Sequence, residues 1–368
     1  QNLLDPGKTP HENEQFLLFL SAVIQAVDEY SDILRASAAN TGNDHRLGAN
    51  EAPPAIISVY LGEQLADIFA QLEENGGADH SKSGGELKVG VTTLPTLRKD
   101  STDRNRTSPF AFTGNKFEFR MVPSSASIAT PNTTLNTIVA ETLSRIADRL
   151  EKAKDIDAEV PKIIKEIVKD HKRIIFNGNN YSEEWLKEAE KRGLPNIRST
   201  VEAVKVWGSP KAITLFEKHH VLSKVELHSH YEIYLENYSK QINIEALTML
   251  DMAKRQILPA ILKYTGEVAQ SLNQIKTASA KANVVAFEDL LHTLTETTAA
   301  FNRNLTALEK ALNEAEKENE DSLKIAEYFR DVVFAAMGRL RVEADRLETM
   351  VDAKVWPFPT YADMLFNV

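Results

Sequence analysis

The sequence contains no cysteine, which excludes disulfides, thiolate metal sites and cysteine nucleophiles. It also lacks an uninterrupted apolar run long enough to cross a bilayer, and its first thirty residues do not have the layout of a signal peptide. Basic residues are in the minority, since 43 lysines and arginines stand against 53 aspartates and glutamates, a net charge of −10. Nucleic-acid binding normally requires a clustered basic surface. We therefore expect a cytoplasmic protein with neither a nucleic-acid nor a membrane partner.

The length and the first residues bear on domain organisation. A chain of 368 residues can bury a large core, and this length favours two domains or one domain with an appendage. The chain starts with Gln1 instead of methionine, and residues 1–7 are typical of a loop. We expect the sequence to be a piece of a longer protein.

The first part of the chain, residues 1–135, mixes helical and strand patterns. Thr9-Pro10-His11-Glu12 has the pattern of a capping box and predicts a helix that begins there and continues to about residue 34. An arginine-bearing loop is expected from about residue 38. A second helix is predicted over residues 54–73, followed by a glycine-rich surface loop over 75–85.

Two segments of this part have strand patterns, residues 87–91 and 117–122. In the second segment, phenylalanines alternate with Glu118 and Arg120. Because alternate side chains of a strand point to opposite faces, we expect this acid and this base to share one face, with the phenylalanines anchoring the other.

The rest of the chain, residues 136–368, is predicted to be almost wholly helical. Long helical patterns cover residues 224–280, with a bend or break at Pro259, and 285–351, with an interruption near residues 319–321. Antiparallel bundle packing is indicated by apolar residues near sevenfold spacing, namely Leu294, Leu305, Leu308, Leu312 and Phe301. An aromatic tail over 356–361 is expected to dock onto the body. The predicted fold class is α+β, predominantly α-helical, with short antiparallel strands followed by a long-helix bundle.

Histidines gather at two places, His219-His220 and the pair His228 and His230. Imidazole is a common metal ligand, but residues two apart on a helix point to nearly opposite sides. We favour a solvated or partner-facing helix over a metal site there.

Short polar motifs concentrate arginines and carboxylates in the first part of the chain. They are Arg46-Leu47 followed by Glu51, Asn105-Arg106-Thr107, and Glu118-Phe119-Arg120. Phosphoryl transfer needs fixed positive charge around phosphate oxygens, and the arginine side chain supplies it as a planar fork of donors. The residue types alone leave a second interpretation open, because most loop arginines are solvated or contact helix ends.

In this order, and with the neighbouring Glu51-Ala52-Pro53, the motifs resemble those of glutamine synthetase. The longer phrases at residues 44–51 and 103–110 are similar to the type III form. The resemblance covers residues 1–135 as the C-terminal half of the catalytic domain, and residues 136–368 as the helical C-terminal region of that form. The family's earlier acidic metal ligands and its Gly-x-His motif have no counterpart in this sequence.

The resemblance implies a role for each motif residue. Arg46 would bind the carboxylate of the substrate glutamate. Arg120 would hold the γ-glutamyl phosphate, so both arginines would contact the substrate. Glu51 would sit on a flap that closes over glutamate and would help to receive a proton from ammonium. Arg106 would contact the transferring phosphate, and Glu118 would ligate Mg²⁺ or Mn²⁺.

One arginine of the family pattern is missing, since Ser108-Pro109-Phe110-Ala111 stands where the second arginine after the Asn-Arg-Ser turn is usual. Arg104 or Lys116 would then supply part of the contact with ATP phosphates.

The activity that the resemblance implies is the ligation of ammonia to L-glutamate, which gives L-glutamine through γ-glutamyl phosphate. ATP and Mg²⁺ or Mn²⁺ would be the cofactors, and the enzyme would be a ring-forming homo-oligomer, expected to be a dodecamer. The fragment alone is expected to be inactive. The alternative is a non-catalytic helical module, derived from that enzyme, for oligomerisation or regulator docking. A Glu-x-Glu strand and a Gly-x-His segment upstream of Gln1 would favour the enzyme.

Overall fold

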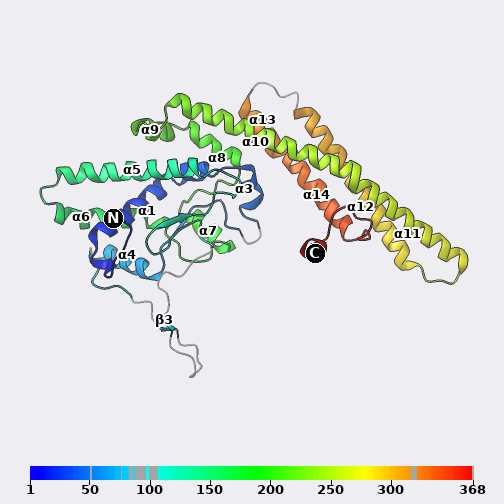
Figure 1. Ribbon diagram of the computed structural model, residues 1–368, viewed down its shortest axis with the longest axis horizontal. Helices are drawn as coiled ribbons and strands as arrows, with labels where there is room; N and C mark the ends of the chain where they lie inside the picture. Colours follow the sequence, from blue (N-terminus) through cyan, green and yellow to red (C-terminus); the bar gives the residue numbers. More distant parts are fainter. Residues whose placement is uncertain are drawn as a thin grey trace. The chain divides into compact units, whose positions relative to one another are not determined.

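The computed structural model describes residues 1–49, 52–75, 77–82, 86–87, 97–98, 107–315 and 321–366. Their contacts define two compact units, Gln1–Tyr231 and Glu232–Val368. The fold is α+β and predominantly helical, as predicted (Figure 1). Among the described helices, none is both long and apolar enough to cross a membrane.

The compact units divide at a different place from the predicted domains, whose boundary at residues 135/136 follows the change in sequence character. Helix α5 (Ala129–Lys152) crosses that boundary and packs against α1 (Glu14–Glu29) and α2 (Ser31–Ser37). The beginning of the helical region is therefore part of the first compact unit.

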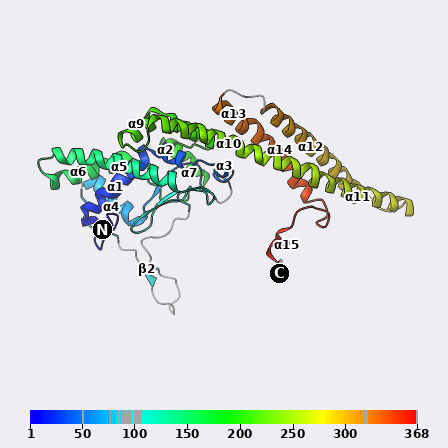
Figure 2. The ribbon, with the colours of Figure 1, turned by 45° about the horizontal axis from the view of Figure 1, so that its top comes forward.

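Besides these three helices, the first unit contains a series of shorter elements. They are η1 (Pro10–Glu12), α3 (Thr41–Arg46), α4 (Glu63–Asn75), α6 (Ile156–His171), η2 (Lys172–Ile174), α7 (Glu183–Lys191), α8 (Thr200–Val204), η3 (Lys205–Gly208) and α9 (Pro210–Lys218). Helix α1 packs against both α5 and α6, and the three lie side by side in Figures 1 and 2. Helix α10 (Lys224–Met252) begins in the first unit and ends in the second.

The first predicted helix starts later than its capping box indicates. Pro10–Glu12 form a turn of 3₁₀ helix, and the Thr9 side chain makes no capping hydrogen bond. Asn13 is the N-cap of α1 instead, because its side chain accepts a hydrogen bond from the Phe16 amide. The helical pattern that runs on to residue 34 belongs to two helices, which meet at Tyr30.

The predicted helix over residues 54–73 is wrong in its first part. Residues 55–61 are all buried, and Val59–Tyr60 form strand β1, so that helix α4 begins at Glu63. This stretch is apolar almost throughout and rich in β-branched residues, so it offers no polar face for a surface helix. A short apolar run of this kind fits a buried strand as well as a helix, and periodicity alone does not separate the two.

A three-stranded sheet lies in the first unit, with β4 (Phe110–Phe112) between β1 and β5 (Phe117–Phe119). β5 pairs antiparallel with β4 and confirms the core of the strand predicted over 117–122, whereas β1 runs parallel to β4, a pairing that the sequence did not predict. A second pair consists of β2 (Glu86–Leu87) and β3 (Leu97–Arg98). Residues 88–91 of the other predicted strand lie outside the described residues, as does part of the glycine-rich loop.

Aromatic side chains anchor this sheet to the helices. The Phe110 ring lies 5.0 Å from that of Phe117 and 6.1 Å from that of Phe119, centre to centre. Phe112 extends the cluster to Phe16 on α1, at 5.9 Å. Strands of three residues are marginal by themselves, so burial of these rings stabilises the hairpin of β4 and β5.

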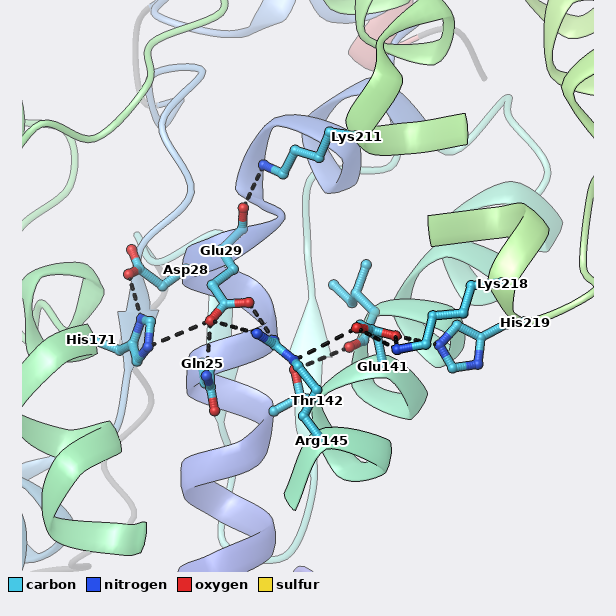
Figure 3. A network of polar contacts seen from close by, with 11 residues as sticks. Gln25, Asp28, Glu29, Glu141, Thr142, Arg145, His171, Lys211, Lys218 and His219 are labelled. Atoms are coloured by element: carbon cyan, nitrogen blue, oxygen red, sulfur yellow. Dashed lines mark hydrogen bonds and ion pairs between the residues drawn. The ribbon is translucent and has the colours of Figure 1, made fainter. Parts of the chain in front are cut away.

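A network of polar side chains links α1, α5, α6 and the end of α9 in the first unit (Figure 3). On α1, the buried Asp28 carboxylate lies 2.8 Å from Nδ1 of His171, and Glu29 contacts Arg145 of α5. One turn earlier on α5, Glu141 accepts hydrogen bonds from Lys218 at 2.9 Å and from His219 at 2.7 Å. His219, one of the clustered histidines, thus contacts a carboxylate from another helix.

The pKa of Glu141 reflects two opposing influences. Burial raises this pKa, but the hydrogen bonds from Lys218 and His219 outweigh it and hold the pKa below its ordinary value of 4.5. Because the folded state favours the ionised carboxylate, this contribution to stability is present above pH 4.5 and is lost as the pH falls through the lowered pKa.

The second unit is a helical bundle, as the spacing of its leucines predicts. Its described elements after α10 are η4 (Ala253–Ile257), α11 (Leu258–Ala278), α12 (Val285–Ala315), α13 (Ser322–Tyr328), η5 (Phe329–Phe334), α14 (Ala335–Glu348) and α15 (Tyr361–Leu365). Helix α12 packs against α11 and α14, and the predicted core residues of α12 are buried. Hydrogen bonds from Asn304 to the Arg339 carbonyl and from Tyr328 to the Ala311 carbonyl show that α12 is antiparallel to the α13–α14 segment.

The predicted breaks in the long helices have visible causes. A π-helical segment, η4, directly precedes α11, whose second residue is Pro259, and proline cannot donate the backbone hydrogen bond that a regular helix requires. In the later helix, α12 ends at Ala315, and Asp321 caps α13 by accepting from the Leu323 amide. Of the predicted docking tail, Trp356 is buried.

We predict that Glu141→Gln lowers the free energy of unfolding at pH 7 by about 1.5 to 3 kcal/mol, because Lys218 and His219 lose a charged acceptor. The loss should shrink as the pH falls below 4.5 and through the lowered pKa of the wild-type carboxylate. Urea unfolding followed by circular dichroism, at pH 7 and at a series of pH values below 4.5, measures this. Glu202→Gln is the control, because its pair with Lys205 is a surface pair at 3.0 Å. Equal losses in the two variants would contradict the prediction.

Candidate functional site

The hairpin of β4 and β5 presents an acid and a base together. Arg120 donates to one carboxylate oxygen of Glu118 from Nη2 at 2.8 Å and from Nε at 3.1 Å. The other oxygen accepts from the Thr113 hydroxyl at 3.2 Å and lies 3.7 Å from Lys116 Nζ. Glu118 and Arg120 therefore share one face, as the alternation predicts, while Phe117 and Phe119 pack against Phe110.

This acid–base pair is accessible and ionised. The Glu118 side chain is 30% exposed and that of Arg120 is 25% exposed. The hydrogen bond from Arg120 lowers the pKa of Glu118, burial opposes it, and Thr113 and Lys116 add to the lowering. Glu118 is thus a carboxylate at neutral pH, and a ligand can reach both side chains.

Arg46 lies beside the end of the same hairpin. It is the last residue of α3, so the predicted arginine-bearing loop is here a short helix. Its Nη2 donates at 2.9 Å to the carbonyl of Met121, the residue that directly follows Arg120 in the chain. Its Nε is buried and has no hydrogen-bond partner within the described part of the chain. An anion beside this nitrogen would satisfy it.

Two neighbours fix Arg46, and both belong to the sequence run that contains it. The buried Asn43 side chain donates to the Met121 carbonyl at 3.1 Å and to the Ala38 carbonyl at 2.6 Å. Asp44 accepts from the Thr200 amide at 2.7 Å and ties α3 to α8. Their side chains serve to place the helix, a role that motif spacing does not reveal.

The structure thus brings Arg46, Glu118 and Arg120 to one region, although the first is 72 or more positions from the others in the sequence. Glu51, Arg104 and Arg106 lie outside the described residues, and their roles stay predictions.

A complete divalent-metal site is not formed by the described residues. Among them, no group of three or more histidines, aspartates or glutamates is suited to hold a metal ion. Glu118 offers one oxygen donor of the kind that Mg²⁺ and Mn²⁺ prefer, but it is paired with Arg120. Glu118 is thus engaged in an ion pair, and the described residues do not complete a metal site around it.

Comparisons with known proteins agree with the motifs. Residues 159–276 match the family described as glutamine synthetase C-terminal domain. The chain is 42% identical, over 99% of its length, to the type-3 glutamine synthetase of Dictyostelium discoideum. It is 40% identical to a glutamine synthetase of Butyrivibrio fibrisolvens and 34% identical to one of Bacteroides fragilis, over 100% of its length in both cases.

The chain is therefore homologous to glutamine synthetases along its whole length. More particularly, its relatives include a protein named type-3, which confirms the resemblance found in the motifs. The chain spans about half the length of the curated relatives that it matches, with 50%, 52% and 51% of them covered.

The contact between Arg120 and Glu118 gives a prediction that does not depend on function. In Arg120→Gln, the pKa of Glu118 should rise towards its ordinary value of 4.5, because the largest influence that lowers it is removed. Carbon-13 NMR titration of the Glu118 carboxyl group measures this. Lys116→Gln is the matched control and should raise the pKa less, because Lys116 lies farther from the carboxylate. A larger effect of the lysine would show that the ion pair is wrongly assigned.

Proposed function

We propose that this chain forms part of an enzyme that ligates ammonia to L-glutamate at the expense of ATP and so produces glutamine. The observation that carries the proposal is the contact of Arg46 with the end of the hairpin that carries the Glu118–Arg120 pair, in a chain homologous to glutamine synthetases. ATP and Mg²⁺ or Mn²⁺ are the proposed cofactors, and a homo-oligomer in the cytoplasm is the proposed form.

The reaction consists of two displacements. A γ-carboxylate oxygen of glutamate attacks the terminal phosphorus of ATP, and ADP leaves. The nitrogen of ammonia then attacks the acyl carbon, the bond to the phosphate oxygen breaks, and the new amide nitrogen loses a proton. The protein must hold the anionic acyl phosphate between the steps and keep water away from it.

The described arginines have the chemistry for the anionic groups. Arg46 would bind the α-carboxylate of glutamate, and the buried, unpartnered Nε of Arg46 supports this assignment. Arg120 would hold the acyl phosphate, because a guanidinium keeps its charge and presents several donors at once. Since Arg120 is already oriented by Glu118, little reorganisation is required when charge develops on the phosphoryl group.

Three further assignments fall outside the described residues. Glu51 would receive the proton from ammonium, while Arg106 and Arg104 would contact the phosphates of ATP. They rest on the motif resemblance alone.

We predict that Arg120→Ala in the complete gene product lowers kcat/KM for glutamine formation while the protein stays folded. Loss of one charge-assisted contact to the transferring phosphoryl group should raise the barrier by about 2 to 4 kcal/mol, a factor of about 30 to 900. Steady-state assays and thermal melting on one preparation test this. Lys169→Ala serves as the control, because Lys169 is exposed and has no ion-pair partner in the described part of the chain. Near-normal activity of Arg120→Ala would remove Arg120 from the mechanism.

We predict that Glu118→Gln raises the concentration of Mg²⁺ or Mn²⁺ that gives half-maximal activity, because glutamine keeps the size of the side chain but is a neutral and weaker ligand. The substitution also removes the negative charge that pairs with the Arg120 guanidinium. Thr113→Val is therefore the comparison, since it removes a hydrogen bond to the same carboxylate and leaves the charge. If the metal requirement is unchanged in Glu118→Gln, or changes equally in Thr113→Val, Glu118 is not a metal ligand.

A second candidate function is an assembly or regulator-docking module, which the antiparallel packing of α11, α12 and α14 in the second unit favours. Several large apolar side chains are exposed on α10 and α11, namely Ile233, Ile244, Leu247 and Leu262. Size-exclusion chromatography with light scattering, applied to the complete protein and to Leu247→Glu, tests this role. A lower subunit number with unchanged activity per subunit would show that these exposed side chains serve assembly and not catalysis.

A further inference from the structure

A loop from the helical region joins the edge of the small sheet. The Phe176 amide donates to the Val59 carbonyl at 2.9 Å, and Ile175 makes a parallel bridge with Val59. One residue further, the Asn177 side chain accepts from the amides of Leu61 and Gly62 at 3.0 and 3.1 Å. Residues 175–177 therefore lie alongside β1, within the stretch that matches the C-terminal domain of the family.

Asn180, at the end of this loop, is buried and connects three separate parts of the chain. Its side-chain oxygen accepts from the Ser58 hydroxyl at 2.6 Å. Its backbone amide and its side-chain nitrogen both donate to the Thr107 hydroxyl, at 3.0 and 3.4 Å. Asn180 is 1% exposed and Ser58 is fully buried, so water does not compete for the hydrogen bond between these two side chains.

A short path leads from this contact to Arg120. Thr107 is followed by Ser108, whose buried hydroxyl donates to the Phe110 carbonyl at 2.9 Å, and by Pro109. The Pro109 carbonyl accepts the backbone amide of Arg120 at 2.8 Å. The segment that Asn180 holds at one end thus holds the backbone of Arg120 at the other.

We propose that Asn180 is a positioning residue for Arg120, acting through Thr107 and the backbone of Pro109; this rests on the proposed function. Asn180 lies on a loop of the helical region and makes hydrogen bonds with Ser58, Thr107 and the Gly178 carbonyl. Without its side chain, the Thr107 hydroxyl keeps the backbone donor of residue 180 but loses the side-chain donor, and the buried Ser58 hydroxyl loses its acceptor. The start of β4 is then held less firmly. Displacement of a positioned group by about 1 Å can lower a rate about a hundredfold, so a small shift of Arg120 would appear in kcat.

The opposing interpretation is that Asn180 anchors the loop and contributes to stability alone. Asn177 provides the matched control, because it anchors the same loop through two hydrogen bonds to backbone amides, yet it contacts the segment between β1 and α4 instead of Thr107. Loss of either asparagine side chain loosens the same loop. A purely structural role predicts that the two losses have the same consequence for activity.

The experiment compares four variants of the complete gene product: Asn180→Ala, Asn177→Ala, Thr107→Val and Thr107→Ser. Valine keeps the shape of threonine but removes the acceptor, whereas serine keeps the hydroxyl. Thr107→Val also covers the case in which Asn180→Ala does not fold. Steady-state kinetics with glutamate varied and thermal melting are measured on each preparation.

We expect Asn180→Ala and Thr107→Val to lower kcat by about 10- to 100-fold, with the KM for glutamate within about twofold of wild type. Thr107→Ser should be close to wild type, and Asn177→Ala should keep its kcat even though its melting temperature falls. The proposal is overturned if kcat falls alike in the two asparagine variants, or if Thr107→Val is fully active.

Hydrogen exchange separates failure of this proposal from failure of the proposed function. The Arg120 amide, which donates to Pro109, should exchange faster in Asn180→Ala and Thr107→Val but not in Asn177→Ala. If the wild-type protein forms no glutamine, the proposed function fails, and the exchange pattern still decides whether Asn180 places Arg120. Unchanged exchange at Arg120 in Asn180→Ala overturns the placement itself.

Discussion

The candidate site depends on one short strand, β4, because it holds both neighbouring strands in place. β4 pairs parallel with β1 and antiparallel with β5, and its phenylalanine rings meet those of β5 and of α1. Three residues of strand give few ladder hydrogen bonds, so burial of aromatic rings must supply much of its stability. Because Phe117 and Phe119 anchor one face of β5 against Phe110, the opposite face does not have to be apolar and can present Glu118 and Arg120.

The charged groups of the site are partly neutralised in the structure itself. Arg120 is paired with Glu118, and Arg46 donates to the Met121 carbonyl. Two guanidinium groups can therefore lie near the same hairpin end without a bound anion. An anionic ligand that bound here would replace one of these partners instead of meeting a bare charge, and such an exchange would favour groups that match the hydrogen-bonding geometry of the guanidinium.

The sequence predicted those features that depend on local pattern. Alternation along β5 correctly placed Glu118 and Arg120 on one face. The buried residues of α12 follow the predicted sevenfold spacing. Such features involve neighbours within one or two turns or strand residues, so the chemical pattern of a few residues contains them.

Features that depend on distant partners escaped prediction. Residues 55–61 read as a helix because a short apolar run has no decisive period, and the pairing of β1 with β4 resolved the choice. Asn180 has no recognisable signal, since a loop of asparagines around a glycine, here residues 177–180, is typical of an ordinary turn. Its partners Ser58 and Thr107 stand 122 and 73 positions away, and the fold alone brings them together.

The boundary between the two compact units restricts which part of the helical region could form a separable module. The stretch that matches the family's C-terminal domain covers residues 159–276, but the contacts divide the chain after Tyr231. Its first part, including α6, α7 and the loop that carries Asn180, packs within the unit that contains the candidate site. A fragment that starts at residue 136 would begin inside α5 and would lack α1 and α2, against which α5 packs. A separable helical module would therefore correspond to the second unit, and most of the preceding helices belong, by their packing, to the unit that contains the candidate site.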